Sequence, residues 1–205
     1  MTAQTGKIAI VDSGVANLAS VNAAIQRLGA EAEITSDAKH IRAASHVILP
    51  GVGAAATAMR NLRQRNLPEV LCQLAQPVLG ICLGMQLLFV RSHEGTGEPV
   101  DCLSLLSGEV TSLRASPQTP VPHMGWNQLS LQRPYHALLR GIDDGSFVYF
   151  VHSYAMLETD AALATTEYGQ RLAAVVAHKN FFGCQFHPER SGAIGARILE
   201  NFLDM

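Results

Sequence analysis

Short apolar runs alternate with segments of helical period through the first half of the chain. The runs are typical of buried strands and cover residues 8–11, 32–35, 47–49 and 77–81. Apolar residues return every three or four positions from Leu18 to Leu28, and the Ala-, Leu- and Arg-rich stretch 54–74 is also helical in pattern, with an interruption expected at Pro68. This alternation predicts βαβ units, which build a mostly parallel sheet covered by helices.

The second half of the chain adds further short strands, several of which we expect to be antiparallel. The candidates are residues 108–113, 127–131, 147–151, 162–166, 173–178 and 183–186. A helix that packs one apolar face, from Ile194 to Leu203, closes the chain. There is no repeat or convincing linker, and the Pro-rich stretch 117–122 is expected to be an exposed loop. We therefore expect a single α/β domain over residues 1–205, with a central sheet flanked by helices and extended by antiparallel strands.

Charge and hydropathy exclude several classes of protein. Fifteen Lys and Arg stand against 17 Asp and Glu, a net charge of −2, so neither a nucleic acid nor an anionic membrane surface is an expected partner. The longest nearly apolar run, Pro77 to Val90, is too short to span a bilayer. The amino terminus, Met1 to Lys7, is polar and leads into too few apolar residues for a secretory signal. A cytoplasmic location is the expectation.

The metal-binding residue types show no metal-site spacing. The four cysteines are unevenly spaced and form no CxxC pair, so each is expected to be a free thiol. Most of the histidines are interpreted as structural or solvated: His40, His46, His93, His123, His136 and His178. His152 either shapes a pocket or packs behind one. Neither a metal nor a cofactor is therefore expected.

The segment Gly80-Ile81-Cys82-Leu83-Gly84 joins a buried strand to a helical pattern, which is the form of a nucleophile elbow with Cys in place of Ser. Such a turn strains the central residue, and the flanking glycines let neighbouring chains approach without a Cβ clash. The helix N-terminus would favour a Cys82 thiolate, and the Leu83 N–H would face a developing oxyanion. The alternative is a buried structural cysteine.

A base for this nucleophile is found in Phe186-His187-Pro188-Glu189-Arg190. Residues two apart in an extended segment point the same way, so Glu189 is expected to reach the second ring nitrogen of His187 and fix its tautomer. Pro188 keeps His187 out of the helical region. A surface ion pair is the alternative, but Cys82, His187 and Glu189 together match a Cys-His-acid triad.

The turn Pro50-Gly51-Val52-Gly53 follows the strand at 47–49 and precedes a helix. Its backbone N–H groups can face an anionic centre at the sheet edge, which makes Val52 and Gly53 candidates for the second part of an oxyanion hole. A plain strand-to-helix connection is the alternative. The turn lacks the Lys-Ser/Thr ending of a Walker phosphate loop.

These three motifs, extended to Met85-Gln86 and Gln185, resemble those of the class I glutamine amidotransferases in order and spacing. The stretches Pro122 to Asn127 (PHMGWN) and Tyr149 to Tyr154 (YFVHSY) resemble one branch of that family, the glutaminase subunits of imidazole glycerol phosphate synthases in histidine biosynthesis. The similarity covers essentially the whole chain. It implies a three-layer, flavodoxin-like glutamine amidotransferase domain.

The resemblance also implies roles for these residues. Cys82 would attack the side-chain amide of glutamine, His187 would protonate the departing ammonia and later activate water against the thioester, and Glu189 would orient His187. Leu83 and the Val52-Gly53 turn would stabilise the oxyanion. The residues placed near the bound glutamine are Gln86, Glu94, Ser153 and Tyr154, although a solvent-facing Glu94 would look the same in sequence.

The resemblance further implies a face for a synthase partner. The residues assigned to it are Asn17, Met124, Trp126 and Arg190, although Met124 and Trp126 would also suit a core. The branch usually shows Asp-Tyr-Gly and then Gly-Asn after the first strand, whereas this chain has Ser13 and Ala16 at the Tyr and second Gly positions. The contact made by that Tyr is therefore not expected, while Asn17 still matches.

Three classes of function stay open. The first is a glutaminase that passes ammonia to a separate cyclase subunit in a heterodimer, because the glutaminase unit uses all 205 residues and leaves none for a synthetase domain. Such a site is expected to be weak until the partner docks. The second is another enzyme on the same fold: a glutaminase of a different ammonia-channelling synthase, or a cysteine peptidase or other thiol hydrolase. A non-catalytic binding protein is the third, and the intact triad argues against it.

Overall fold

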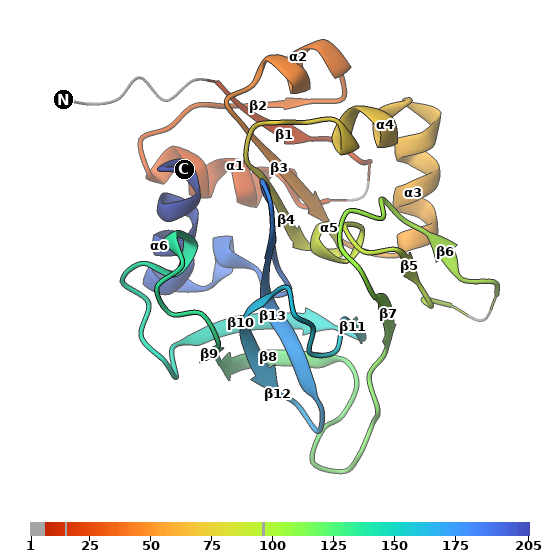
Figure 1. Cartoon of the computed structure of the whole chain (residues 1–205), viewed down its shortest axis with the longest axis vertical. Coiled ribbons are helices and arrows are strands. Elements are labelled where there is room, and N and C mark those ends of the chain that lie inside the picture. Colours follow the sequence, from red (N-terminus) through yellow and green to blue (C-terminus); the bar gives the residue numbers. More distant parts are fainter. Residues whose placement is uncertain (1–6, 15, 96) are drawn as a thin grey trace.

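A computed structural model describes residues 7–14, 16–95 and 97–205 of the chain (Figure 1). Apart from Lys7, the polar amino-terminal stretch Met1 to Lys7 lies outside them. An eight-stranded sheet with the order β2-β1-β3-β4-β14-β13-β12-β9 runs through the molecule. Its strands are β1 (Ile8–Val11), β2 (Ala32–Thr35), β3 (His46–Gly51), β4 (Val78–Cys82), β9 (Ser130–Leu131), β12 (Ala162–Glu167), β13 (Arg171–His178) and β14 (Phe181–Cys184).

The sheet is mixed in the way the sequence predicts. Strands β2, β1, β3, β4 and β14 pair in parallel, whereas β14, β13, β12 and β9 pair antiparallel. Parallel strands need crossover connections, and helices supply them in the first half. The predicted α/β fold with a mostly parallel centre and added antiparallel strands is confirmed.

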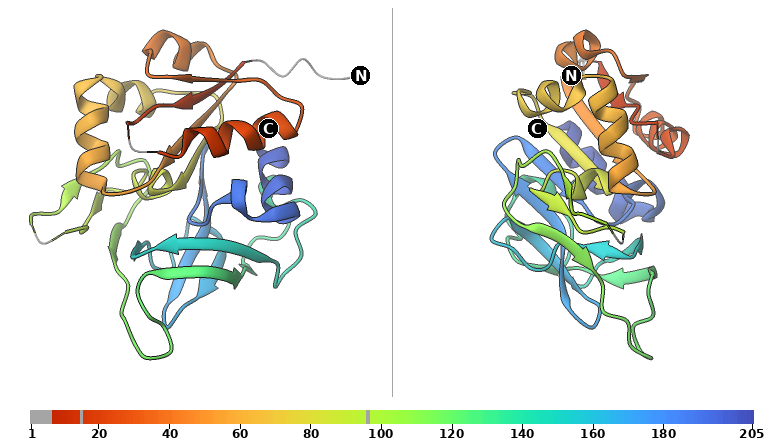
Figure 2. Two further views of the ribbon diagram at one scale, coloured as in Figure 1. Left: turned by 180° about the vertical axis from the view of Figure 1, so that it is seen from behind. Right: turned by 90° about the vertical axis from the view of Figure 1, so that its right-hand side faces the viewer.

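Helices cover both faces of the parallel part. They are α1 (Leu18–Arg27), α2 (Ala38–Ala43), α3 (Ala55–Gln64), α4 (Leu67–Cys72) and α6 (Gly192–Leu203). Side chains alternate along β1, so Ile8 and Ile10 pack with α1 and α6, whereas Ala9 and Val11 pack with α2, α3 and α4. Figure 2, seen from behind, shows α1 and α6 in front of the sheet. No helix in the described ranges is long and apolar enough to cross a membrane.

Two smaller sheets surround the carboxyl ends of the parallel strands. One pairs β8 (His123–Gln128) with β10 (Phe147–His152), and the other has the order β11-β7-β5-β6. The second sheet consists of β5 (Arg91–Ser92), β6 (Val100–Asp101), β7 (Glu109–Ser112) and β11 (Tyr154–Ala155). The remaining elements are α5 (Leu83–Gln86) and the 3₁₀ turns η1 (Ala137–Leu139) and η2 (Pro188–Arg190).

Several expected boundaries are wrong. The interruption of the long helical stretch lies at Asn66, which adopts a left-handed conformation with φ 55°, whereas Pro68 sits in the first turn of α4, where its missing N–H costs nothing. The single strand expected at 127–131 is divided between β8 and β9. Strand β14 ends at Cys184 and not at Phe186, and α2 has no counterpart among the expected elements.

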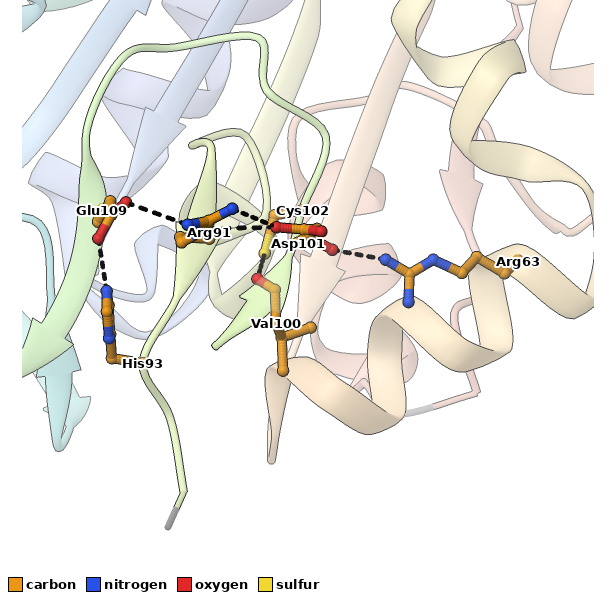
Figure 3. Close-up of polar contacts among 7 residues, drawn as sticks. All are labelled: Arg63, Arg91, His93, Val100, Asp101, Cys102 and Glu109. Carbon is orange, nitrogen blue, oxygen red and sulfur yellow. Dashed lines mark hydrogen bonds and ion pairs between the residues drawn. The ribbon is translucent and has the colours of Figure 1, made fainter. Parts of the chain in front are cut away.

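Polar side chains tie the β5-β6-β7 sheet together and attach it to α3 (Figure 3). Arg91 contacts Asp101 at 2.9 Å and Glu109 at 3.8 Å, and Nε2 of His93 lies 2.5 Å from Glu109. Arg63 of α3 donates to the Asp101 carbonyl oxygen at 2.7 Å. Exposed pairs of this kind add little stability each. They do hold β6 beside the end of α3.

Candidate active site

A cavity of about 320 Å³ opens at the carboxyl ends of β3 and β4. This is the edge at which parallel α/β sheets usually bind their ligands. The residues that line it are Val52, Gly53, Cys82, Leu83, Gln86, Glu94, Pro122, Val151, His152, Ser153, Tyr154 and His187. The structure therefore brings the predicted nucleophile, base, oxyanion turn and substrate contacts to one place. Pro122 and Val151 are not anticipated by the sequence.

Cys82 is the last residue of β4 and has a strained backbone, with φ 53° and ψ −110°. Helix α5 begins at the next residue, as a nucleophile elbow requires. The helix has four residues only, so its dipole favours a thiolate less than the sequence interpretation assumed. Cys82 is 6% exposed and lines the cavity, and its sulfur lies 3.8 Å from the Val151 carbonyl oxygen.

Glycine is required on both sides of Cys82 by close backbone contacts. A Cβ on Gly84 would lie 1.7 Å from the carbonyl oxygen of Leu49, and a Cβ on Gly80 would lie 2.6 Å from the carbonyl oxygen of Gly84. These contacts hold β4 and α5 against β3 at the strained residue. The sequence argument for the two glycines is confirmed.

His187 and Glu189 form a buried hydrogen-bonded pair. Nδ1 of His187 lies 2.8 Å from Oε1 of Glu189, and the two side chains are 7% and 3% exposed. The alternative of a surface ion pair is therefore wrong. The expected extended segment is also wrong, because Glu189 lies in the 3₁₀ turn η2 while His187 just before it is extended. Ser191 fixes this turn by donating to the His187 carbonyl oxygen at 2.7 Å.

The electrostatic surroundings of His187 favour the imidazolium. Burial acts against the charge, but interactions with Cys82 and Glu189 outweigh it and raise the pKa of His187 to about 10. Since Nδ1 is bound to Glu189, Nε2 is the ring atom left for proton transfer, and it is buried without a hydrogen-bond partner among the described residues. A base with one nitrogen fixed and the other free suits general acid–base chemistry.

The oxyanion candidates lie at the ends of adjacent strands. Gly51 ends β3 and pairs in register with Cys82 of β4, so the Val52-Gly53 turn begins beside the nucleophile. Leu83 is the first residue of α5, and its N–H has no partner within the helix because no residue precedes it by a full turn. Val52, Gly53 and Leu83 all line the cavity.

The side chains of Gln86 and Glu94 are held by the protein on one side of the cavity. Nε2 of Gln86 donates to the Tyr154 carbonyl oxygen at 2.7 Å and to Oε1 of Gln185 at 3.1 Å, which leaves its own oxygen for a ligand. One oxygen of Glu94 accepts from the Ala55 N–H at 2.5 Å, at the start of α3. Glu94 is half-buried and lines the cavity.

Gln185 is a site residue whose position sequence reasoning missed. It is fully buried, and its Nε2 lies 3.9 Å from the Cys82 sulfur while its Oε1 accepts from Gln86. The residue stands two positions before His187, so the alternation of an extended chain was the signal that could have placed it on the nucleophile side.

Aromatic and cationic side chains gather on an exposed face formed by β8, β10 and η2. Met124 is 66% and Trp126 is 56% exposed, so the core alternative for both is wrong. The ring of Tyr149 lies 6.0 Å from that of Trp126, and the Arg190 guanidinium lies 5.0 Å above Tyr149. Asn17 caps α1 by accepting from the Ser20 N–H at 3.3 Å.

The remaining thiols are free and unlike Cys82 in setting. Burial raises the pKa of Cys102 to about 11 and also raises the pKa of Cys72 and of Cys184. Within residues 7–14, 16–95 and 97–205, no group of three or more His, Cys, Asp and Glu side chains is arranged to hold a metal ion.

A strained cysteine at a strand–helix turn, beside a buried His–Glu pair on an α/β sheet, defines a thiol-dependent acyl-transfer site. The chain belongs to the class-I glutamine amidotransferase family, whose family model matches residues 9–205. It is 52% identical over 198 residues to the imidazole glycerol phosphate synthase subunit HisH of Idiomarina loihiensis, with 97% of both chains covered.

Other comparisons agree. The chain is 49% identical over 202 residues to the imidazole glycerol phosphate synthase subunit HisH of Photorhabdus laumondii, covering 97% of this chain and 100% of that one. Among solved structures, one of a glutamine amidotransferase matches with a TM-score of 0.73 at 18% identity, covering 96% of this chain and 97% of the other. The latter likeness concerns the fold alone.

Proposed function

We propose that this chain is the glutaminase subunit of an imidazole glycerol phosphate synthase. It hydrolyses glutamine to glutamate and ammonia and passes the ammonia to a separate cyclase subunit in histidine biosynthesis. The observation that carries the proposal is the meeting of Cys82 and His187 in one cavity, with Glu189 bound behind the histidine. The names of the similar HisH proteins support the choice of synthase. We further propose that residues 1–205 form one domain and that the protein is cytoplasmic.

The first half of the reaction forms a thioester. The Cys82 sulfur attacks the side-chain amide carbon of glutamine, and the carbonyl electron pair moves onto its oxygen. The N–H groups of Leu83 and of the Val52-Gly53 turn stabilise that oxyanion. As the tetrahedral intermediate collapses, the C–N bond breaks and His187 gives its Nε2 proton to the departing nitrogen, which leaves as ammonia.

The second half releases glutamate. Nε2 of His187, now neutral, takes a proton from a water molecule that attacks the thioester carbon. The C–S bond breaks, and the Cys82 sulfur leaves as a thiolate beside the regenerated imidazolium. Glu189 keeps the proton on Nδ1 throughout, which reserves Nε2 for both transfers. The raised pKa of His187 is consistent with an imidazolium that can supply the Nε2 proton.

Glutamine binding requires groups for its ammonium and for its carboxylate. The Glu94 carboxylate and the free oxygen of Gln86 supply the negative side of the cavity and suit the ammonium. Ser153 and Tyr154 also line the cavity, and the Tyr154 carbonyl oxygen accepts from Gln86. A cavity of about 320 Å³ is large enough for one glutamine molecule.

The exposed face of Met124, Trp126, Tyr149 and Arg190 is the proposed docking surface for the cyclase subunit. Aromatic residues, Met and Arg are the types enriched in protein interfaces. Strand β10 carries Tyr149 on this face and Val151 on the cavity wall, so docking and glutamine binding share one strand. Asn17, matched by the family motif, is assigned to the same interface.

The test compares two ammonia sources in the reconstituted complex. The Cys82→Ala variant is expected to abolish the glutamine-dependent synthase rate and to retain the ammonia-dependent rate, because only the first needs the thioester. Cys72→Ala, which removes an exposed thiol away from the cavity, serves as the control and should retain both rates. An equal loss of both rates in Cys82→Ala would make Cys82 structural. If peptides were cleaved while a glutamine-analogue chloroketone failed to label Cys82, the chain would be a peptidase.

A further inference from the structure

Two buried histidines form a continuous hydrogen-bonded chain, in which His152 lines the cavity and His123 does not. Nδ1 of His152 lies 2.9 Å from the Tyr154 carbonyl oxygen, and its Nε2 lies 2.9 Å from Nδ1 of His123. Nε2 of His123 in turn lies 3.2 Å from Nδ2 of Asn127. His123 and His152 are opposite residues of β8 and β10, so the strand register creates their contact.

The direction of every hydrogen bond in this chain is determined from both ends. At one end a carbonyl oxygen only accepts, so His152 must carry its proton on Nδ1 and accept at Nε2. At the other end, Asn127 donates to the Glu167 carbonyl oxygen at 2.9 Å and accepts from the Gln128 N–H at 2.8 Å, so the nitrogen of its amide faces His123. His123 therefore accepts at Nε2 and donates from Nδ1 to His152.

This series of hydrogen bonds can form only when both imidazole rings are neutral, and the surroundings of the rings keep them neutral. A second proton on either ring would place two donors against each other. His123 is sandwiched between the rings of Tyr168 and Phe150, at centroid distances of 3.9 and 4.6 Å. Burial lowers the pKa of His123 to about 4, and burial, with like charge from His123 and His187, lowers the pKa of His152 to about 3.

The chain ends on a cavity group that also holds Gln86. The Tyr154 carbonyl oxygen accepts from both His152 Nδ1 and Gln86 Nε2. Gln86 Nε2 has its second acceptor in Gln185, so both of its protons are used and its oxygen is the part left for the ligand. The orientation of the Gln86 amide therefore depends on a carbonyl that His152 fixes in place.

We propose that His123 and His152 are positioning residues for glutamine: their directional chain fixes the Tyr154 carbonyl and, through it, the Gln86 amide on the cavity wall. This inference rests on the proposed glutaminase function. It assigns a role to His123, which touches neither the cavity nor the nucleophile and which sequence reasoning interpreted as structural or solvated.

The first test separates glutamine binding from the chemistry in the complex with the cyclase subunit. His152→Leu removes the donor to Tyr154, and His123→Phe keeps a ring between Tyr168 and Phe150 but breaks the chain. Each is expected to raise the KM for glutamine about 10-fold, as for one lost hydrogen bond, with kcat changed less than about threefold. His152→Asn places an amide nitrogen near the former Nδ1 and is expected to restore KM to within about threefold of wild type.

A control variant and two labelling reagents exclude a general structural effect. His46→Phe removes another buried histidine, at the amino end of β3 and away from the cavity, and should leave KM unchanged. Iodoacetamide reacts with Cys82 without binding in the glutamine pocket, so it reports the reactivity of the thiol alone. A glutamine-analogue chloroketone needs both a reactive thiol and an intact glutamine pocket. His152→Leu and His123→Phe are expected to slow the chloroketone about 10-fold and iodoacetamide less than about twofold. Equal slowing of both reagents, or an unchanged KM, would overturn the inference.

The wild-type complex provides a measurement that needs no variant. In ¹⁵N NMR spectra of the imidazole rings, His123 and His152 should both be neutral at pH 7 with the proton on Nδ1. A proton on Nε2 of either ring would contradict the proposed directions of the hydrogen bonds. Failure of the chloroketone to label wild-type Cys82 would instead overturn the proposed function, and the inference with it.

Discussion

Gly84 packs so closely on Leu49 that a Cβ on the glycine would lie 1.7 Å from the leucine carbonyl oxygen. This contact joins the turn after the nucleophile to the end of β3, where the Pro50-Gly51-Val52-Gly53 turn begins. Both segments of the proposed oxyanion hole are therefore held by one backbone contact.

Replacing that glycine is expected to disrupt the fold at the nucleophile. Gly84→Ala places a methyl group into a backbone oxygen that cannot move without shifting β3, so we expect a loss of more than about 3 kcal/mol in the free energy of unfolding. Urea denaturation measures this. Gly97→Ala, where an added Cβ meets nothing within 4 Å, is the matched control and should be close to neutral. A Gly84→Ala stability within about 1 kcal/mol of wild type would contradict the close contact.

The Glu189 carboxylate is expected to matter for catalysis more than for binding. In Glu189→Gln an amide faces Nδ1 of His187 and favours the wrong tautomer, so we expect kcat for glutamine hydrolysis to fall by about 10² to 10⁴. Steady-state assays with the cyclase subunit measure the loss. Glu200→Gln, which removes an exposed carboxylate paired with Arg197, is the control and should retain activity. A rise in the KM for glutamine with an unchanged kcat would argue against the orienting role of Glu189.

The His187 imidazolium is expected to lose its stabilisation when Cys82 is replaced. The pKa of His187 is raised from 6.5 to about 10, so its contribution to stability is complete below pH 6.5 and is lost as the pH rises toward 10. In Cys82→Ser the interaction with the sulfur is gone, and the pKa should fall toward its ordinary value. Titration of the ring by NMR measures this shift. An unchanged titration in Cys82→Ser would show that the sulfur does not interact with the ring.

The two-histidine chain predicts sensitivity to mild acid. The pKa values of His123 and His152 are lowered to about 4 and 3, so the unfolded chain takes up protons near pH 6.5 while the folded chain does not. Their contribution to stability is therefore present above pH 6.5 and decreases as the pH falls toward 4 and 3. Unfolding free energies measured between pH 5 and 6.5, above the main carboxylate range, should decrease less in His123→Phe than in wild type. Equal slopes would count against the neutral chain.

Trp126 is expected to be a centre of the cyclase interface. Removing a large exposed aromatic that contacts Tyr149 should cost about 2 kcal/mol of binding, or roughly 30-fold in Kd, in Trp126→Ala. Isothermal titration calorimetry with the cyclase subunit measures the change. Ile34→Ala is the control. It alters an exposed apolar residue on β2, an edge strand of the large sheet that is not part of the β8-β10 sheet, and should leave Kd unchanged. If both variants changed Kd equally, β8 would not be part of the cyclase interface.

The local hydrophobic pattern predicted much of the fold, because helices and strands depend largely on residues that are near in the sequence. The run at 77–81 is apolar enough to be buried on both faces, and the spacing from Leu18 to Leu28 matches α1. Pattern placed the helix break incorrectly, since Asn66 adopts a left-handed turn that composition does not signal. The site motifs were visible for the same reason: glycines around Cys82 and a His–Glu pair two residues apart are local features.

The sequence by itself determined the class of fold, the strained cysteine turn and the residues that the family motifs carry. Only the tertiary structure decided which polar atoms meet across long separations in the chain. Glu94 accepts from the start of α3, Gln185 bridges Cys82 and Gln86, and His123 meets His152 because β8 and β10 pair in one register. Hydrogen bonds act over about 3 Å, so a shift of one residue in strand pairing would remove the last contact while leaving the sequence pattern unchanged.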